Sequence, residues 1–176
     1  FLRPEDIAER ESRANTHVDR LFHTARRNRE SYLIEPQILA RLLAKKWRRA
    51  NGDESIPADI CEEGIENYFL EYAEQHSSEA SSNLIIQNEN YLRSDRKTRV
   101  LELIRLFDLQ YETPLEEGII PLALLNSKGA MATLRTYIAD EYHIHFSDRE
   151  VFMDYEPEEV PQDIQTVVKA ISDLFL

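Results

Sequence analysis

Cysteine, glycine and long apolar runs are scarce in this chain of 176 residues, and each shortage excludes a class of protein. Cys61 is the only cysteine, so the chain forms neither an internal disulfide framework nor a cysteine-based zinc site, and we expect an intracellular location, cytoplasmic or nuclear. Only four glycines are present, fewer than a β-sandwich or a glycine-rich phosphate-binding α/β fold normally has. The longest apolar runs, such as residues 119–125, fall far short of the roughly 20 residues that cross a bilayer, so we expect no membrane partner.

Helical periodicity is what the sequence does contain. Hydrophobic residues make up 42% of the chain, which at this length is enough to bury a core without a metal or a disulfide. Strand-type alternation is rare, whereas apolar residues recur three and four positions apart over most of the chain. We therefore predict an all-α fold of about eight helices, in a compact orthogonal or bundle arrangement of two helical groups.

Proline, glycine and capping residues indicate where several helices begin and end. Pro36 should start a helix that Gly52 terminates, because proline suits a first turn and glycine suits a left-handed stop. Residues 113–116 (Thr-Pro-Leu-Glu) have the pattern of a capping box, and they should open a helix that residues 126–129 close. Residues 147–150 (Ser-Asp-Arg-Glu) predict a second capping box.

A polar segment divides the predicted helices. Residues 76–84 are rich in serine, whose side chain competes with helical hydrogen bonds, and we predict a loop there. A first helix is expected over residues 4–29. Because the sequence begins at Phe1 rather than at methionine, we expect the chain to be part of a longer protein. The predicted division is an N-terminal helical subdomain with a basic start (1–76), a loop and short connecting segment (77–94) and an acidic C-terminal helical subdomain (95–176).

Charge changes sign along the chain. Residues 1–50 carry 12 Lys and Arg against 7 Asp and Glu, a net of +5, and the remaining residues carry 9 against 26, a net of −17, which together give −12. Such a total excludes a uniformly basic nucleic-acid binder but not a locally basic one. The candidate binding residues are a basic cluster around a tryptophan (Lys45, Lys46, Trp47, Arg48, Arg49), a second basic cluster (Arg93, Arg96, Lys97, Arg99) and an acidic set (Asp154, Glu156, Glu158, Glu159).

The basic cluster around Trp47 has two interpretations. Four bases beside an aromatic ring can hold phosphates while the ring stacks on a base. Alternatively, bases in a last helical turn complement the helix dipole, and Trp47 continues the apolar stripe of Leu39 and Leu43 into the core. We favour the second interpretation. The second basic cluster opens a helix, where the dipole disfavours positive charge, and a solvated face that pairs with acids is its simplest explanation.

Catalytic and metal-binding patterns are sparse. His143 and His145 stand two positions apart, which on an extended segment puts both on one face, but two histidines make only half of a zinc site. The acidic neighbours of Cys61 indicate a buried structural cysteine rather than a nucleophile. Residues 107–119 have the outline of an EF-hand, but Thr and Ile stand where calcium requires glycine and a bidentate glutamate, which leaves a metal-free helix-loop-helix. The sequence therefore predicts no cofactor and no metal site.

One family resemblance concerns the C-terminal part of the chain. Residues 138–150 (IADEYHIHFSDRE), followed after an insertion by Ile-Gln-Thr-Val at residues 164–167, resemble the second half of an acyl carrier protein, a small four-helix family. The family attaches its prosthetic group at an Asp-Ser-Leu motif, and residues 126–129 read Asn-Ser-Lys-Gly at the corresponding place. The resemblance therefore implies a degenerate carrier-like domain with Ser127 at the attachment position.

Three functions follow from these patterns, and we favour the first. It is a non-enzymatic α-helical interaction domain, an adaptor or scaffold within a larger protein or complex, which binds a protein partner through a charge-polarised surface. The second is a nucleic-acid-associated subunit that uses the basic N-terminal third. The third is an enzyme or a degenerate acyl-carrier-like domain, for which Ser127, His143 and His145 are the best candidate residues.

Overall fold

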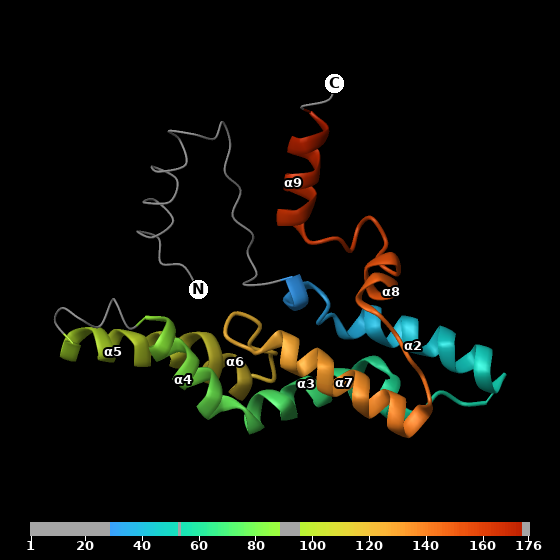
Figure 1. The fold of residues 1–176 in the computed structure, drawn as a ribbon, viewed down its shortest axis with the longest axis horizontal. Coiled ribbons are helices and arrows are strands. Elements are labelled where there is room, and N and C mark those ends of the chain that lie inside the picture. The colour runs from blue at the N-terminus through green and yellow to red at the C-terminus, as the bar shows by residue number, and fades with distance from the viewer. Residues whose placement is uncertain (1–28, 53, 89–95, 174–176) are drawn as a thin grey trace. The chain divides into compact units, whose positions relative to one another are not determined.

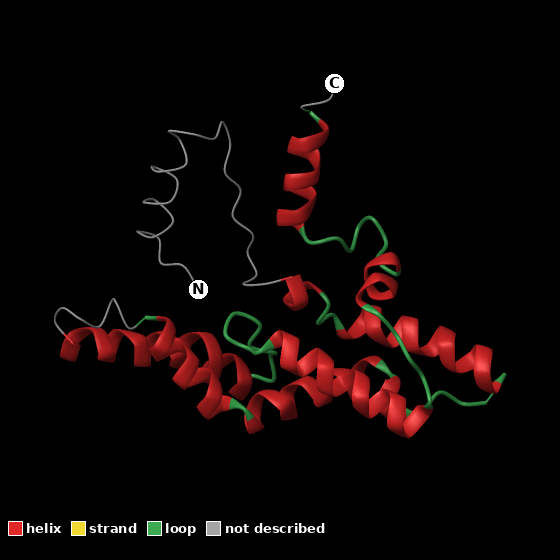
Figure 2. Cartoon of the chain, in the orientation of Figure 1, coloured by secondary structure: helices red, strands yellow, loops and turns green. Residues whose placement is uncertain are grey.

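The computed structural model describes residues 29–52, 54–88 and 96–173, and within these ranges the chain is helical without any strand (Figures 1 and 2). The predicted all-α class is confirmed, and the number of helices is close to the expected one. The helix predicted over residues 4–29 lies outside the described residues apart from its last position. Residues 28–155 form one compact unit, and residues 156–173 belong to a second unit that is described by itself. The predicted division into two subdomains stays a prediction.

Helix α2 (Pro36–Asn51) begins and ends where the sequence predicts. Pro36 occupies the first turn, and Gly52 ends the helix with a φ of 66°, a left-handed conformation that glycine adopts without strain. The fully buried side chains of Leu39 and Leu43 lie one turn apart on the side that packs against α3 (Glu62–Gln75). This pair of helices forms the centre of the larger unit.

A short 3-10 turn, η2 (Ala58–Ile60), precedes α3 and packs closely on it. Gly64 permits this approach, because a Cβ at that position would lie 2.3 Å from the carbonyl oxygen of Ala58. Ile65 and Phe69 of α3 are fully buried and continue the core from α2. Residues 58–75 are therefore divided between η2 and α3 and do not form one continuous helix.

The loop predicted over residues 76–84 is wrong, because α4 (Ser77–Gln87) occupies this segment. Ala80 and Leu84 are both buried, so their packing stabilises a helix in this segment despite the low helix propensity of its serines. The serine side chains also find partners that do not disturb the helix. The hydroxyl of Ser77 donates to Glu112 at 2.7 Å, and that of Ser82 donates to the carbonyl of Ser78 at 2.8 Å.

The second correction concerns residues 107–126. Helix α5 (Arg96–Phe107) continues through a π-helical turn, η4 (Asp108–Glu112), into α6 (Thr113–Glu116), so neither a capping box nor an EF-hand-like loop interrupts it. The widened π turn provides room for Pro114, whose ring would clash with a carbonyl in a regular helix interior. Tyr111 holds the turn in place, because its buried hydroxyl donates to the carbonyl of Ala73 on α3 at 2.9 Å. The chain then leaves the helical state before residue 119 instead of continuing to residue 125.

Helix α7 (Ser127–Tyr142) starts where the sequence predicts a helix end. Asn126 is its N-cap and accepts a hydrogen bond from the backbone N–H of Gly129 at 3.1 Å. A Cβ on Gly129 would approach the hydroxyl of Tyr72 to 2.5 Å, so packing against α3 explains the glycine better than a helix stop does. The capping box predicted at residues 147–150 is confirmed, and it opens α8 (Asp148–Met153) against α2.

Helix α9 (Gln162–Ser172) follows Pro161 in the smaller unit and has no buried residue. Its apolar residues nevertheless recur at helical spacing and form one stripe (Ile164, Val167, Val168 and Ile171). Among the described residues, no helix combines the length and apolarity that crossing a membrane requires.

Candidate functional site

The basic cluster on α2 and part of the acidic set predicted as a separate surface lie against each other. Lys45 Nζ lies 2.6 Å from Asp154 Oδ1, and Lys46 Nζ lies 2.5 Å from Glu150 Oε1. Arg41, one turn earlier on α2, donates from Nε to Asp154 Oδ2 at 3.0 Å. We name these five residues the α2–α8 ion-pair cluster. Its three bases and two acids partly neutralise one another, so these members of the basic cluster are paired within the chain.

Glu150 connects this cluster to the start of α8. The hydrogen bond from Lys46, and then those from the hydroxyl and backbone N–H of Ser147, lower the pKa of Glu150 from 4.5 to about 2. The same carboxylate therefore completes the capping box and pairs with α2. Within the original basic cluster, Arg48 and Arg49 remain exposed in the last turn of α2. Nucleic-acid binding by the basic N-terminal third stays a prediction.

Trp47 belongs to the periphery of the core. It is half-buried, packs against core residues and meets the ring of Tyr142 edge-on, with ring centroids 6.0 Å apart and planes at 83°. Its indole N–H is buried without a hydrogen-bond partner. The ring is therefore occupied by packing, as the stripe of α2 indicates, and is not presented for stacking on a nucleotide base.

The remaining charged candidates are not gathered into one site. Arg93 lies outside the described residues, and α5 begins at Arg96 and Lys97, whose side chains also lie outside the description. Arg99 is half-buried on α5. In the smaller unit, Glu156 and Glu158 are exposed, and a Glu159 carboxylate oxygen accepts from the backbone N–H of Glu156 at 2.8 Å.

The candidate catalytic residues do not converge. Ser127 is fully buried, and its hydroxyl lies 2.9 Å from that of Ser31, whereas an attachment serine must be accessible to a modifying enzyme. His143 and His145 are both exposed, and His143 caps α7 with a φ of 55°. Cys61 is exposed and precedes α3 as its N-cap residue, so the expectation of a buried cysteine is wrong. In the part of the chain that the structure describes, no three potential metal ligands lie close together.

A carboxylate held by two tyrosines fastens η2 to α7. The hydroxyls of Tyr137 and Tyr142 donate to Asp59 Oδ2 at 2.7 and 2.8 Å. These bonds, that from Tyr137 first, lower the pKa of Asp59, and the bond to Asp59 raises the pKa of Tyr137. Tyr137 also stacks on Tyr68 of α3, with centroids 5.5 Å apart. Two hydrogen bonds therefore connect η2 to α7, and ring stacking connects α7 to α3.

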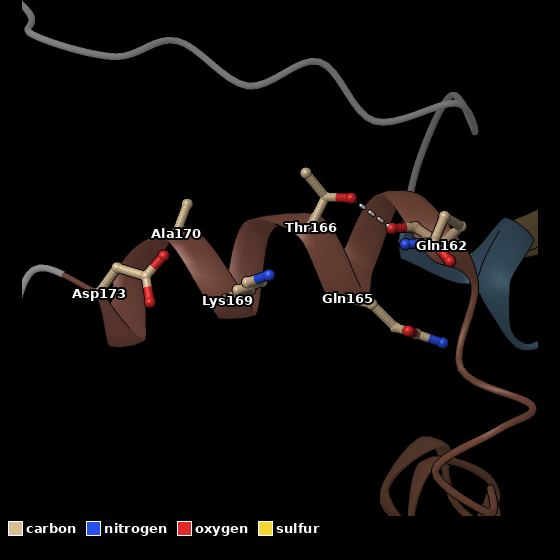
Figure 3. A pocket seen from close by; sticks show the side chains of 6 residues that line it. All are labelled: Gln162, Gln165, Thr166, Lys169, Ala170 and Asp173. Atoms are coloured by element: carbon tan, nitrogen blue, oxygen red, sulfur yellow. Dashed lines mark hydrogen bonds between the residues drawn. The ribbon is translucent and has the colours of Figure 1, made fainter.

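A hollow along α9 is lined by one helix only. Figure 3 shows its six side chains spread along one face of the helix, and the only hydrogen bond among them is that from Thr166 to the carbonyl of Gln162, at 2.7 Å. No described residue from another element faces them across the hollow. It therefore has no convergent polar groups and does not resemble a ligand site.

An apolar groove between α4 and α5 is the feature that the sequence did not reveal. The two helices contact each other (Figure 1), and the groove between them has a volume of about 160 Å³. Large apolar side chains at its rim and beside it are open to solvent, with Ile104 49% and Ile86 67% exposed. We name this feature the α4–α5 groove; its lining residues are Ser81, Leu84 and Ile85 of α4 and Val100, Leu103, Ile104 and Phe107 of α5.

The groove lies on the most basic helix of the acidic part of the chain. Helix α5 contains four bases, Arg96, Lys97, Arg99 and Arg105, against one acid, Glu102, whereas α4 contains a single charged residue, Glu79. Arg105 is exposed one position from the groove residue Ile104. The composition of α5 is therefore basic in a chain whose net charge is −12.

Comparison of this chain with protein-family models, with curated proteins and with solved structures finds no match. The function has therefore to be inferred from the described geometry.

Proposed function

We propose that this chain is a non-enzymatic helical protein-interaction domain, and that its α4–α5 groove binds the apolar face of an amphipathic helix with acidic flanks. The observation that carries the proposal is the solvent exposure of two large apolar side chains that line the groove from its two helices, Ile85 at 46% and Ile104 at 49%. Contiguous apolar surface on a folded domain is characteristic of a binding site.

The shape of the groove favours a helix as the ligand. Its α5 side is formed by residues at positions i, i+3, i+4 and i+7 (Val100, Leu103, Ile104 and Phe107). A ridge with this spacing accommodates the matching ridge of a second helix, as in other helix-in-groove complexes. The bases of α5 would then favour a ligand with acidic flanks, because charge complementarity selects partners and orientations.

The alternative functions receive less support from the described residues. A carrier function requires an accessible serine, and Ser127 is buried beside Ser31. Nucleic-acid binding requires several free bases on one surface, and Lys45 and Lys46 pair with acids of α8.

The test measures peptide binding to the full chain. Two fluorescent helical peptides share one Ile/Val stripe and differ only in acidic or basic flanks, and their binding is followed by anisotropy. We expect the acidic peptide to bind more tightly than the basic one, and Ile104→Glu to weaken it at least about tenfold, since a charge then faces its apolar stripe.

Leu109→Glu is the matched control, because Leu109 is also an exposed apolar residue but does not line the groove. It should bind the acidic peptide like the unmodified chain, and circular dichroism should show unchanged helix content in both variants. Equal loss in Ile104→Glu and Leu109→Glu, or no binding of either peptide to the unmodified chain, would refute the proposed function.

A further inference from the structure

Helix α9 has an apolar stripe that the described structure leaves open to solvent. Its members, which recur three and four positions apart, are Ile164, Val167, Val168 and Ile171. None of them is buried, and Val168 and Ile171 are 60% and 49% exposed. Because a helix of 11 residues is marginal without tertiary packing, we expect a cover over this stripe.

The larger unit begins and ends close to one place. The hydroxyl of Tyr155, its last residue, donates to the backbone carbonyl of Tyr32. Tyr32 in turn closes η1 (Arg29–Tyr32), the first described element of the unit. The remaining parts of the chain, residues 1–27 and 156–176, make up the second unit. They are therefore attached to the larger unit at neighbouring points.

The segment that precedes the described residues has the sequence of an amphipathic helix. Apolar residues recur at helical spacing in the helix predicted over residues 4–29, and most of them lie within residues 14–25: Ala14, Val18, Leu21, Phe22 and Ala25. As a helix, residues 14–25 would be about 17 Å long, which is enough to cover the α9 stripe of about 10 Å. What distinguishes this segment from any other amphipathic helix is its attachment beside α9. Only residues 156–161 separate Tyr155 from α9, and such short connections give an effective concentration on the order of millimolar.

Charges near the two attachment points have opposite signs. Arg26 and Arg27 stand immediately before the larger unit begins, and Glu156 and Glu158, which are exposed, follow immediately after it ends. Residues 156–176 contain five acids against one base. Opposite charges at the shared end of two segments favour their association in one orientation.

We propose that residues 14–25 of the same chain cover the apolar stripe of α9, so that the two ends of the chain form a pair of packed helices. The second unit then has a small apolar core of its own, which consists of the two stripes. This inference does not depend on the α4–α5 groove or on its ligand.

Hydrogen–deuterium exchange of the full chain, measured by mass spectrometry on peptides of α9, tests the proposal. Leu21→Glu places a charge in the N-terminal stripe and should raise the exchange rate of α9 at least about tenfold, because α9 loses its cover. Thr16→Glu adds the same charge on the opposite side of the predicted helix and should leave α9 unchanged. Exchange in α2 and α3 should be the same in all three chains. If α9 exchanges equally fast in Leu21→Glu and in the unmodified chain, the proposal is wrong.

Photocrosslinking from α9 identifies the cover directly. A benzophenone is attached to the single cysteine of a Cys61→Ser, Val168→Cys chain, and the crosslinked peptides are identified by mass spectrometry. We expect them to come from residues 1–28 of the same copy, which a mixture of isotope-labelled and unlabelled chains distinguishes from a second copy. A label at Thr166→Cys, on the polar face of α9 that Figure 3 shows, should give fewer of these crosslinks. Crosslinks to α4 or α5, crosslinks between copies only, or equal yields from the two labels would each overturn the proposal.

Discussion

The α2–α8 ion-pair cluster allows a quantitative prediction for Asp154→Ala. The Asp154 carboxylate is 11% exposed and accepts hydrogen bonds from Arg41 Nε at 3.0 Å and from Lys45 Nζ at 2.6 Å. Lys45 is 48% exposed, so solvent screens its pair and we assign it about 0.5 kcal/mol. Arg41 is only 26% exposed, and its charged hydrogen bond contributes about 1.5 kcal/mol. Asp154→Ala should therefore lower the free energy of unfolding by about 2 kcal/mol.

Urea unfolding followed by tryptophan fluorescence measures this effect directly. Trp47 is the only tryptophan and lies on α2, the helix that supplies the three bases of the cluster. Glu158→Ala is the matched control, because it removes the same charge from an exposed site for which the structure shows no ion pair. The control should change stability by less than about 0.5 kcal/mol. High salt should reduce the difference between the two variants, because it screens partly exposed pairs.

Equal unfolding midpoints for Asp154→Ala and Glu158→Ala would refute this reasoning. They would mean that α8 is held on α2 by apolar packing alone, with fully buried Val151 as its main contact. A double-mutant cycle then identifies the error. Coupling between Arg41 and Asp154 should exceed coupling between Lys45 and Asp154, because burial strengthens the first pair.

Three further predictions concern single contacts. Gly64→Ala should lower the free energy of unfolding by about 2 kcal/mol in urea titrations, because its Cβ would meet the Ala58 carbonyl at 2.3 Å. Glu150→Gln keeps the capping geometry but loses the charge, and it should cost about 0.5–1 kcal/mol of stability at neutral pH, because Glu150 is partly exposed. The folded pKa of Glu150 is lowered from 4.5 to about 2, so the stability difference between the two chains should be complete above pH 4.5 and disappear as the pH falls towards 2. Tyr137→Phe removes the main hydrogen bond to Asp59, so the pKa of Asp59, followed by carboxyl NMR, should rise towards its ordinary value.

Helix ends could be predicted from sequence where one residue type determines the backbone. Gly52 is such a residue, because its positive φ favours glycine whatever surrounds it. The capping box at residues 147–150 is another, since both of its hydrogen bonds lie within four residues. In each case the decisive interaction is local, so the sequence alone contains it.

The errors occur where a distant contact decides between local alternatives. Residues 76–84 have a loop-like composition, yet Ala80 and Leu84 are buried and the segment becomes helical. Residues 113–116 match a capping box, but the buried Tyr111 hydroxyl reaches α3 and favours a continuous helix. Asn126 is compatible with a helix stop as well as with an N-cap, and its hydrogen bond to Gly129 selects the second. No local pattern contains these contacts.

The charged candidates illustrate the same limit for the functional site. The sequence correctly places bases on α2 and acids around α8, but it cannot show that Lys45 and Asp154 neutralise each other across the fold. Net charge along a chain is therefore not a charge distribution in space. A charged surface that is predicted from a run of like charges can be neutralised by oppositely charged side chains that lie far away in the sequence.

A signal for the groove was nevertheless present in α5. Apolar residues occupy six of the eight positions from 100 to 107, which is more than one face of a helix. The larger unit buries Leu103 and packs against Leu106 and Phe107, while Leu101 and Ile104 stay half exposed. The sequence of α5 thus indicates more apolar surface than the core alone uses, and the α4–α5 groove contains part of that surface, at the half-exposed Ile104.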